Sequence, residues 1–397
     1  MKILNRALIT LFAINLTIGL TSQLVQPLFP LYLKETGASE LENALVISIG
    51  NLSSTILMLP AGMLVSRFGK RAFLVISAAM SGVSVLLMAY TRNWMLIIPL
   101  NMLLNVSMCF FMPTRMAIIA ENTDPGNRAR LFGVMNLAWP IAGIVGPLAG
   151  GYLVERLGWS SVFTIAGAIS LVALVPALKV RETKEGAETK TPGARPESSI
   201  FNGDYRPAML TLFTYQVLVT TSMAGVNMIL PLYLQDRFQL SYSLIGAFFT
   251  GSNVLLILTQ LGGGVIADRY SRRRLILLCT ALTPLVLGSW VLFGDWVALF
   301  AVYSLAFALW SLTWPPILAM LTDILPRSLH GAGFGLNMTG SRLGFTVGPM
   351  LAGALYFAPG SLVPFVASAI VYAFALPFAY RLRGSCLLYT SPSPRDS

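Results

Sequence analysis

Twelve apolar segments, each long enough to cross a lipid bilayer as a helix, constrain the fold of this chain more than any other feature. They fall at about residues 7–33, 43–65, 72–90, 94–120, 131–154, 160–178, 207–234, 243–267, 275–293, 296–322, 332–357 and 362–380. Charged residues make up 11% of the chain, against about 25% in a soluble domain, so a soluble fold would lack polar surface. We predict an all-α membrane protein with twelve transmembrane helices.

A polar stretch divides the twelve segments into two groups of six. Residues 179–206 are rich in Lys, Glu, Thr, Gly, Pro and Ser, which is typical of a flexible linker. We therefore predict an N-terminal six-helix bundle at 1–178, a cytoplasmic linker at 179–206 and a second six-helix bundle at 207–384.

The last residues differ in character from the rest of the chain. The stretch from Cys386 to Asp396 can be encoded by the sequence of a transposase-type sequencing adaptor. We interpret residues 385–397 as an artefact, the read-through of library DNA, and leave them out of the fold. The natural sequence is then expected to differ after about Gly384.

The basic residues test the proposed topology. With the N-terminus on the cytoplasmic side, the segments predicted to lie inside hold 20 Lys and Arg residues, and the loops predicted to lie outside hold 4. Cytoplasmic loops of membrane proteins carry an excess of Lys and Arg. The distribution therefore predicts that both termini are cytoplasmic.

The two groups of six are related by an internal repeat with an offset of 202 positions, which takes Pro147 to Pro349. Its clearest element is the glycine-rich stretch from Gly133 to Gly151, which recurs at Gly335 to Gly353. We predict that the following residues form paired hinge and packing surfaces: Gly133, Gly146, Pro147, Gly150, Gly151, Gly335, Gly344, Gly348, Pro349 and Gly353. Two parallel halves with a site between them are typical of transporters whose halves rock against each other.

The loop between the second and third segments is also duplicated. It reads Gly62-Met-Leu-Val-Ser-Arg-Phe-Gly-Lys-Arg71, and its repeat reads Gly264-Val-Ile-Ala-Asp-Arg-Tyr-Ser-Arg-Arg-Arg274. Here the chain resembles the major facilitator superfamily (MFS), whose signature at this loop is G-x-x-x-D-R-x-G-R-R. The resemblance covers nearly all of residues 1–384 and implies two parallel six-helix repeats.

We predict a cytoplasmic latch in which loop arginines pair with acids at nearby helix ends. The latch residues are Gly62, Arg67, Gly69, Arg71, Glu121, Gly264, Asp268, Arg269, Arg273 and Asp323. The first copy has Ser66 where the family has an acid, so the sequence favours a stronger latch in the second half.

The fifth segment resembles the family's antiporter signature, with Ala142 in place of one glycine. The signature occurs in drug/proton antiporters, so the resemblance implies proton-coupled export. The alternative is that these glycines only allow close helix packing. The fourth segment has Asn101 where the family often has an arginine linked to proton coupling, and this weakens the simplest antiport mechanism.

Two arginines lie within predicted spans. An arginine in the middle of a bilayer is usually functional or paired. Arg342 lies near mid-depth of the eleventh span, and we predict a substrate or gating role for it. Arg115 is about one and a half turns from the cytoplasmic end of the fourth span, where it could reach the interface or pair with Glu121.

Polar and aromatic residues within the spans are candidates for a substrate cavity. The substrate-binding candidates are Arg342, Asn15, Gln23, Gln26, Asn101, Asn105, Gln216, Asn227, Trp310 and Asn337. Any of them could instead hold helices together. Since no Asp or Glu lies deep in a span, this set favours neutral or anionic small molecules over cations.

The sequence predicts a secondary transporter that moves small organic molecules by alternating access, a proton-coupled multidrug exporter in the bacterial inner membrane that works as a monomer. The alternative is an importer or facilitator of a sugar or organic anion. With one histidine and no metal-binding or nucleotide-binding motif, we expect no enzyme activity, cofactor, metal or nucleic-acid partner.

Overall fold

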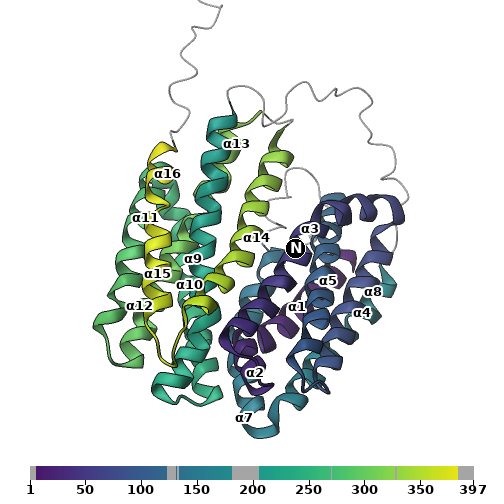
Figure 1. Ribbon diagram of the computed structural model, residues 1–397. Helices are drawn as coiled ribbons and strands as arrows, with labels where there is room; N and C mark the ends of the chain where they lie inside the picture. Colours follow the sequence, from purple (N-terminus) through teal and green to yellow (C-terminus); the bar gives the residue numbers. More distant parts are fainter. Residues whose placement is uncertain are drawn as a thin grey trace, which may run out of the picture. The chain divides into compact units, whose positions relative to one another are not determined.

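The computed structural model describes residues 6–122, 131, 134–180, 205–269, 271–326 and 329–382, and every regular element among them is a helix (Figure 1). The helices of the first repeat are α1 (Arg6–Val25), η1 (Gln26–Leu28), α2 (Phe29–Glu35), α3 (Glu40–Phe68), α4 (Lys70–Met88), α5 (Trp94–Glu121), α7 (Ala138–Val172) and α8 (Leu174–Lys179).

The second repeat continues with the same alternation of long helices and short connections. Its elements are α9 (Arg206–Phe238), α10 (Tyr242–Arg269), α11 (Arg272–Gly288), η4 (Ser289–Leu292), α12 (Trp296–Leu312), α13 (Trp314–Ile324), α14 (His330–Leu355), α15 (Val363–Ala373) and α16 (Leu376–Arg381).

Each of the twelve predicted spans coincides with helix in the part of the chain that the structure describes. Among the described residues, ten helical stretches are long and apolar enough to cross a membrane, and one of them, Val134–Lys179, is 46 residues long. This stretch contains two helices that meet at Gly158, whose φ of 76° is not helical. When these two helices are counted separately and α14 is added, the described residues form twelve long helices. The prediction of an all-helical, multi-pass membrane protein is confirmed.

Short polar residues determine where several helices begin. Ser39 and Glu42 form a capping box at the start of α3, in which the Ser39 N–H donates to the Glu42 carboxylate at 2.8 Å. Asn93 caps α5 and Asp295 caps α12, each accepting from the backbone N–H two residues later, at 2.9 and 3.1 Å. Asn93 and Asp295 are equivalent positions of the repeat, so the duplication extends to the caps.

The chain forms two compact units, which are described separately. Unit 1 comprises residues 1–192, 225–254 and 345–364, and unit 2 comprises residues 193–224, 255–344 and 365–397. Unit 1 thus combines the first repeat with parts of α9, α10 and α14. These units follow contacts rather than sequence, so the proposed boundaries at 178, 206 and 384 stay a prediction.

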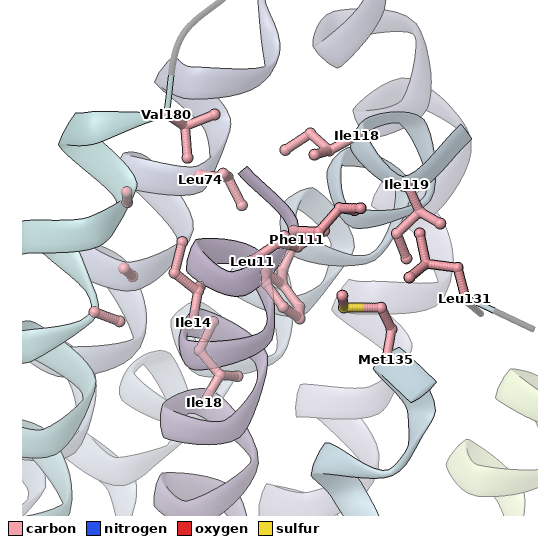
Figure 2. Close-up of a cluster of buried hydrophobic side chains, with 14 residues drawn as sticks. Leu11, Ile14, Ile18, Leu74, Phe111, Ile118, Ile119, Leu131, Met135 and Val180 are labelled. Carbon is pink, nitrogen blue, oxygen red and sulfur yellow. The ribbon is translucent and has the colours of Figure 1, made fainter. Parts of the chain in front are cut away.

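Apolar side chains from α1 and α5 form a buried cluster in unit 1, shown in Figure 2. Leu11 and Ile14 of α1 lie beside Phe111 of α5, and Met135 is packed into the same cluster. All four side chains are fully buried.

Candidate functional site

Two asparagines in unit 1 bond to carbonyl groups that proline leaves without a partner. Proline has no N–H, so the carbonyl four residues before it in a helix loses its usual hydrogen bond. Pro147 of α7 leaves the Gly143 carbonyl, and the Asn253 amide of α10 donates to it at 3.0 Å. In a membrane helix, a neighbouring helix has to supply the missing donor, and here α10 does so.

The second repeat makes the same contact in reverse. Pro349 of α14 leaves the carbonyl of Phe345, and the Asn51 amide of α3 donates to it at 2.9 Å. Asn51 and Asn253 are equivalent positions of the repeat, as are Gly143 and Phe345. In such reciprocal contacts, position i of the first repeat contacts position j of the second, and position j of the first contacts position i of the second. This pattern is typical of a two-fold interface.

Two glycines make a second reciprocal pair. A Cβ placed on Gly151 of α7 would overlap the carbonyl oxygen of Tyr242, and one placed on Gly353 of α14 would lie 2.8 Å from the carbonyl oxygen of Glu40. Glu40 and Tyr242 are again equivalent positions. Glycine is needed at both places because two backbones approach too closely for a side chain.

Lys34 and Asp236 form an ion pair. The two residues are 202 positions apart, so they are equivalent positions of the repeat, and each contacts its own counterpart in the other repeat. The hydroxyl of Tyr356 also donates to the Asp236 carboxylate at 2.9 Å. The Asp236 side chain is 8% exposed and that of Lys34 is 34% exposed. Identical residues at such a position would repel each other, so the two repeats carry opposite charges here.

Arg115 of α5 is buried within unit 1, with a 4% exposed surface. Its Nη1 donates to Asn15 of α1 at 3.1 Å, and its Nη2 donates to Asn136. The Asn15 oxygen also accepts from the Trp139 indole at 3.1 Å. The idea that Arg115 reaches the membrane interface is wrong, because Asn15 and Asn136 hold its guanidinium inside the bundle.

The other amide candidates of the first repeat bond to helix backbone. Asn15 donates to the carbonyl of Met135 at 2.6 Å. Asn101 donates to the Val46 carbonyl of α3 at 2.9 Å, and Asn105 donates to the Asn101 carbonyl at 2.9 Å. The Asn101 bond joins α5 to α3, which is the packing role that was the alternative for such residues. Gln23 is half-buried and Gln26 is exposed.

The candidates of the second repeat lie on α9, α12 and α14. Gln216 donates to the Ser341 hydroxyl at 2.6 Å within unit 2. Trp310 is buried, and its ring packs edge-on against the ring of Trp314, with 4.9 Å between the ring centroids. Asn337 is buried on α14, and its side-chain oxygen has no hydrogen-bond partner among the described residues. Arg342 and Asn227 are both half-buried. Their roles in substrate binding stay predictions.

The predicted cytoplasmic latch is described only in part. Asp323 pairs with Arg272, the neighbour of the predicted Arg273. Arg273 instead donates to the Tyr380 carbonyl at 2.9 Å. Arg71 is exposed. Gly69 separates α3 from α4 with a φ of 94°, which favours glycine. For the following predicted latch positions, nothing beyond the helical backbone is described: Gly62, Arg67, Glu121, Gly264, Asp268 and Arg269.

The glycine surfaces pack closely at most of the described positions. Gly146 and Gly150 of α7 leave no room for a Cβ against Gln23 and Leu24 of α1, and Gly344 of α14 leaves none against Thr220. Gly335 is different, since nothing lies within 4 Å of a Cβ there. Gly133 lies outside the described residues, and Gly348 and Pro349 are buried in α14.

Ala142 stands where the antiporter signature has a glycine, and a glycine on the facing helix α1, Gly19, makes room for it. A Cβ on Gly19 of α1 would lie 3.2 Å from the Ala142 side chain. In the second repeat the equivalent positions are Thr221 and Gly344, so the small residue has moved to the other helix. Close packing is kept in both repeats by one glycine per contact.

Sequence reasoning missed Asn51, Lys34, Asp236, Asn136 and Trp139. Asn51 could have been found by asking which amide serves the carbonyl four residues before Pro349. Lys34 and Asp236 could have been found as equivalent positions with opposite charge. Asn136 and Trp139 had no comparable signal. Among the described residues, no group of His, Cys, Asp and Glu side chains is arranged to hold a metal ion.

Comparisons with known proteins agree with this architecture. A sequence profile of the Major Facilitator Superfamily matches residues 11–224 and again residues 212–395. Multidrug resistance protein 1 of Bacillus subtilis (strain 168) is 26% identical over 357 residues, which cover 88% of each chain. Quinolone resistance protein NorA of Staphylococcus aureus (strain COL) is 24% identical over 361 residues, 87% of this chain and 88% of that one.

A solved structure has the same fold. It is a bacterial homolog of the human lysosomal transporter Spinster, in an inward-facing and occupied conformation. The TM-score is 0.80 at 14% sequence identity, and the alignment covers 94% of this chain and 96% of that one. The likeness extends over nearly the whole chain and shows that the two proteins share a fold.

Proposed function

Because this chain belongs to the Major Facilitator Superfamily, we propose that it is a multidrug-type transporter that exports small organic molecules by alternating access. The observation that carries this proposal is the set of reciprocal contacts around α7 and α14. The relatives that match along nearly the full chain are named for multidrug or quinolone resistance, which supports export of a broad range of small molecules.

Alternating access requires one end of the transport path to close while the other opens. The pairs Asn51–Phe345, Asn253–Gly143 and Lys34–Asp236 join parts of the two repeats within unit 1. Lys34 and Asp236 belong to connections that the basic-residue distribution assigns to the outer side of the membrane. We propose that these contacts form an outer gate that holds this end closed and breaks when it opens.

Protons are the proposed coupling ion, and the bacterial cytoplasmic membrane is the proposed location, with both termini inside and one chain as the working unit. The antiporter-like glycine surface of α7 supports this assignment. Gly146 and Gly150 pack α7 against α1, and Gly151 packs it against the start of α10. Such small-residue surfaces let helices approach closely in a membrane.

The test is a drug-susceptibility screen in a bacterial host that lacks its main efflux pumps. Residues 1–384 are expressed, without the adaptor-like tail, and the cells are exposed to a panel of dyes and antibiotics. We expect raised resistance to several unrelated compounds, with dye efflux that stops when a protonophore collapses the proton gradient. Unchanged susceptibility and unchanged dye accumulation across the panel would contradict export.

A second candidate is an importer or facilitator of a sugar or organic anion on the same fold. One observation favours it: Asn101 stands where the family often has its proton-linked arginine, and its amide is bonded to the Val46 carbonyl. Downhill uptake of such a solute into proteoliposomes, unaffected by a protonophore, would favour this function over proton-driven export.

A further inference from the structure

The guanidinium of Arg115 is buried, and its partners among the described residues are neutral. Its partners are the side-chain oxygens of Asn15 and Asn136, and no described carboxylate pairs with it. The apolar cluster of unit 1 contains Phe111, Ile118 and Ile119 from the same helix (Figure 2), and their spacing of three or four residues from Arg115 places them on the same helix face. A buried charge with no counter-charge is costly, and a bound anion would remove that cost.

One edge of this guanidinium is only half used. Nε is buried and has no hydrogen-bond partner among the described residues, while Nη2 donates to Asn136. The N–H groups of Nε and Nη2 point the same way from the planar group and form a fork that matches a carboxylate or phosphate. An oxyanion that displaced the Asn136 oxygen would therefore gain two parallel hydrogen bonds.

Asn136 is the exposed member of the group, whereas Asn15 is fully buried. Among the described residues, the exposed side chain of Asn136 offers a side from which the fork can be reached, and Trp139 lies half-buried on the same stretch of chain. Asn15 is held in place by Met135 and Trp139, so it fixes the Nη1 side of the guanidinium. The edge of the guanidinium formed by Nε and Nη2 therefore lies on the side of Asn136, and Nη1 is occupied by Asn15.

The second repeat shows that the scaffold does not need this group. The positions equivalent to Asn15, Arg115, Asn136 and Trp139 are Val217, Ile317, Met338 and Ser341. Ile317 is 2% exposed, so an apolar side chain fills the place of the arginine in the same kind of helix. An arginine retained only to join three helices would have no reason to be confined to one repeat.

We infer that Arg115, with Asn15 and Asn136, is an anion subsite for small molecules that carry a carboxylate or phosphate-type oxyanion on an apolar body. The inference rests on the proposed transport function and adds the substrate class to it. Arg115 supplies the charge and the two-donor fork, Asn15 orients the guanidinium, and Asn136 occupies the fork until an anion replaces it.

The test compares a matched pair of probes, 1-pyrenebutyric acid and its primary amide, which share the apolar body and differ in charge. Binding is measured by fluorescence on the purified chain in nanodiscs of zwitterionic lipid. We expect the acid to bind the unmodified chain about tenfold more tightly than the amide, which corresponds to about 1.4 kcal/mol. Equal affinities for the two probes would contradict the subsite.

Three variants separate an anion subsite from a structural brace. Arg115→Gln should abolish the preference for the acid and leave the affinity for the amide unchanged. Arg115→Lys, which keeps the charge and loses the fork, should retain a reduced preference and guards against misfolding of the first variant. Thr114→Val is the matched control, since Thr114 is fully buried next to Arg115 and its hydroxyl donates to the Phe110 carbonyl of the same helix.

Equal weakening of both probes in Arg115→Gln would contradict the inference, because it is the expected result for a brace. Loss of the acid preference in nanodiscs of anionic lipid would contradict it as well, because the fork would then hold a lipid headgroup. Export is scored separately. Failure of the unmodified chain to export any compound of the panel would overturn the proposed function alone, because the comparison of the two probes measures binding and not export.

Discussion

The reciprocal contacts of α7 and α14 differ from the polar group around Arg115 in one respect. The contacts of Asn51 and Asn253 occur twice, related by the 202-residue repeat, whereas the group around Arg115 occurs once. Features that both repeats keep serve the scaffold and its motion, which a parallel duplication shares between its halves. A feature that only one repeat has is free to serve a particular substrate.

The largest expected effect comes from filling the two closest backbone approaches. Gly151→Ala and Gly353→Ala each place a methyl group against backbone of the other repeat, and overpacking typically costs about 1–3 kcal/mol. The cost applies only while the proposed outer gate is closed, so both variants should shift the equilibrium toward the form that is open on the outer side. Modification of a cysteine placed in the outer part of the path should become faster.

Gly335→Ala is the control for this pair, because nothing lies within 4 Å of the added Cβ. Its helix should be slightly favoured, since alanine is about 1 kcal/mol better than glycine in a helix. If only one of Gly151→Ala and Gly353→Ala changes cysteine accessibility, the two contacts are not equivalent and the two-fold description of the gate is wrong.

The next effect concerns the ion pair between equivalent positions. Asp236→Asn should destabilise the closed state of the outer gate by about 1 kcal/mol, and no more, since Lys34 is one-third exposed and water screens the pair. The exchanged variant, Lys34→Asp with Asp236→Lys, should restore the closed end, because the two positions face each other across the repeat. Accessibility in the exchanged variant that stays as high as in Asp236→Asn would count against this symmetry.

A smaller effect is expected for the asparagines that serve the proline carbonyls. Asn253→Leu removes one interhelical hydrogen bond, worth about 0.6 kcal/mol on average in membrane proteins. In a Pro147→Ala background the Gly143 carbonyl regains a helical donor, so the same asparagine change should cost less. A double-mutant cycle on thermal unfolding measures this coupling, and independent effects of the two changes would refute the pairing. Asn51 and Pro349 provide a second, matched cycle.

The smallest effect is expected for the ion pair between Arg272 and Asp323 in unit 2. Both side chains are about half-exposed, at 46% and 50%, and exposed pairs contribute a few tenths of a kcal/mol. Arg272→Gln should therefore change thermal unfolding far less than Asp236→Asn does. A loss of stability as large as that of the Lys34–Asp236 pair would mean that this pair is part of a stronger latch.

Much of this architecture could be predicted from the sequence, because apolar length and glycine spacing are local properties. The twelve spans, the family and the repeat offset were all evident from them. The partners of each polar side chain were not. Arg115 meets Asn15 from 100 positions away, and Asn51 meets the Phe345 carbonyl from 294 positions away. Spacing along one helix cannot supply such information, so the sequence indicated a functional role for Arg342 and not for Arg115.

The measurement that tests the central claim most directly is a reversible cross-link across the outer gate. Lys34→Cys and Asp236→Cys are joined by a reducible bifunctional thiol reagent in residues 1–384, where Cys109 and Cys279 are buried. The account predicts that cross-linked chains stop exporting dye while still binding the pyrene acid, and that reduction of the cross-link restores export. Export that continues in fully cross-linked chains would show that the pair need not separate, and would contradict the account.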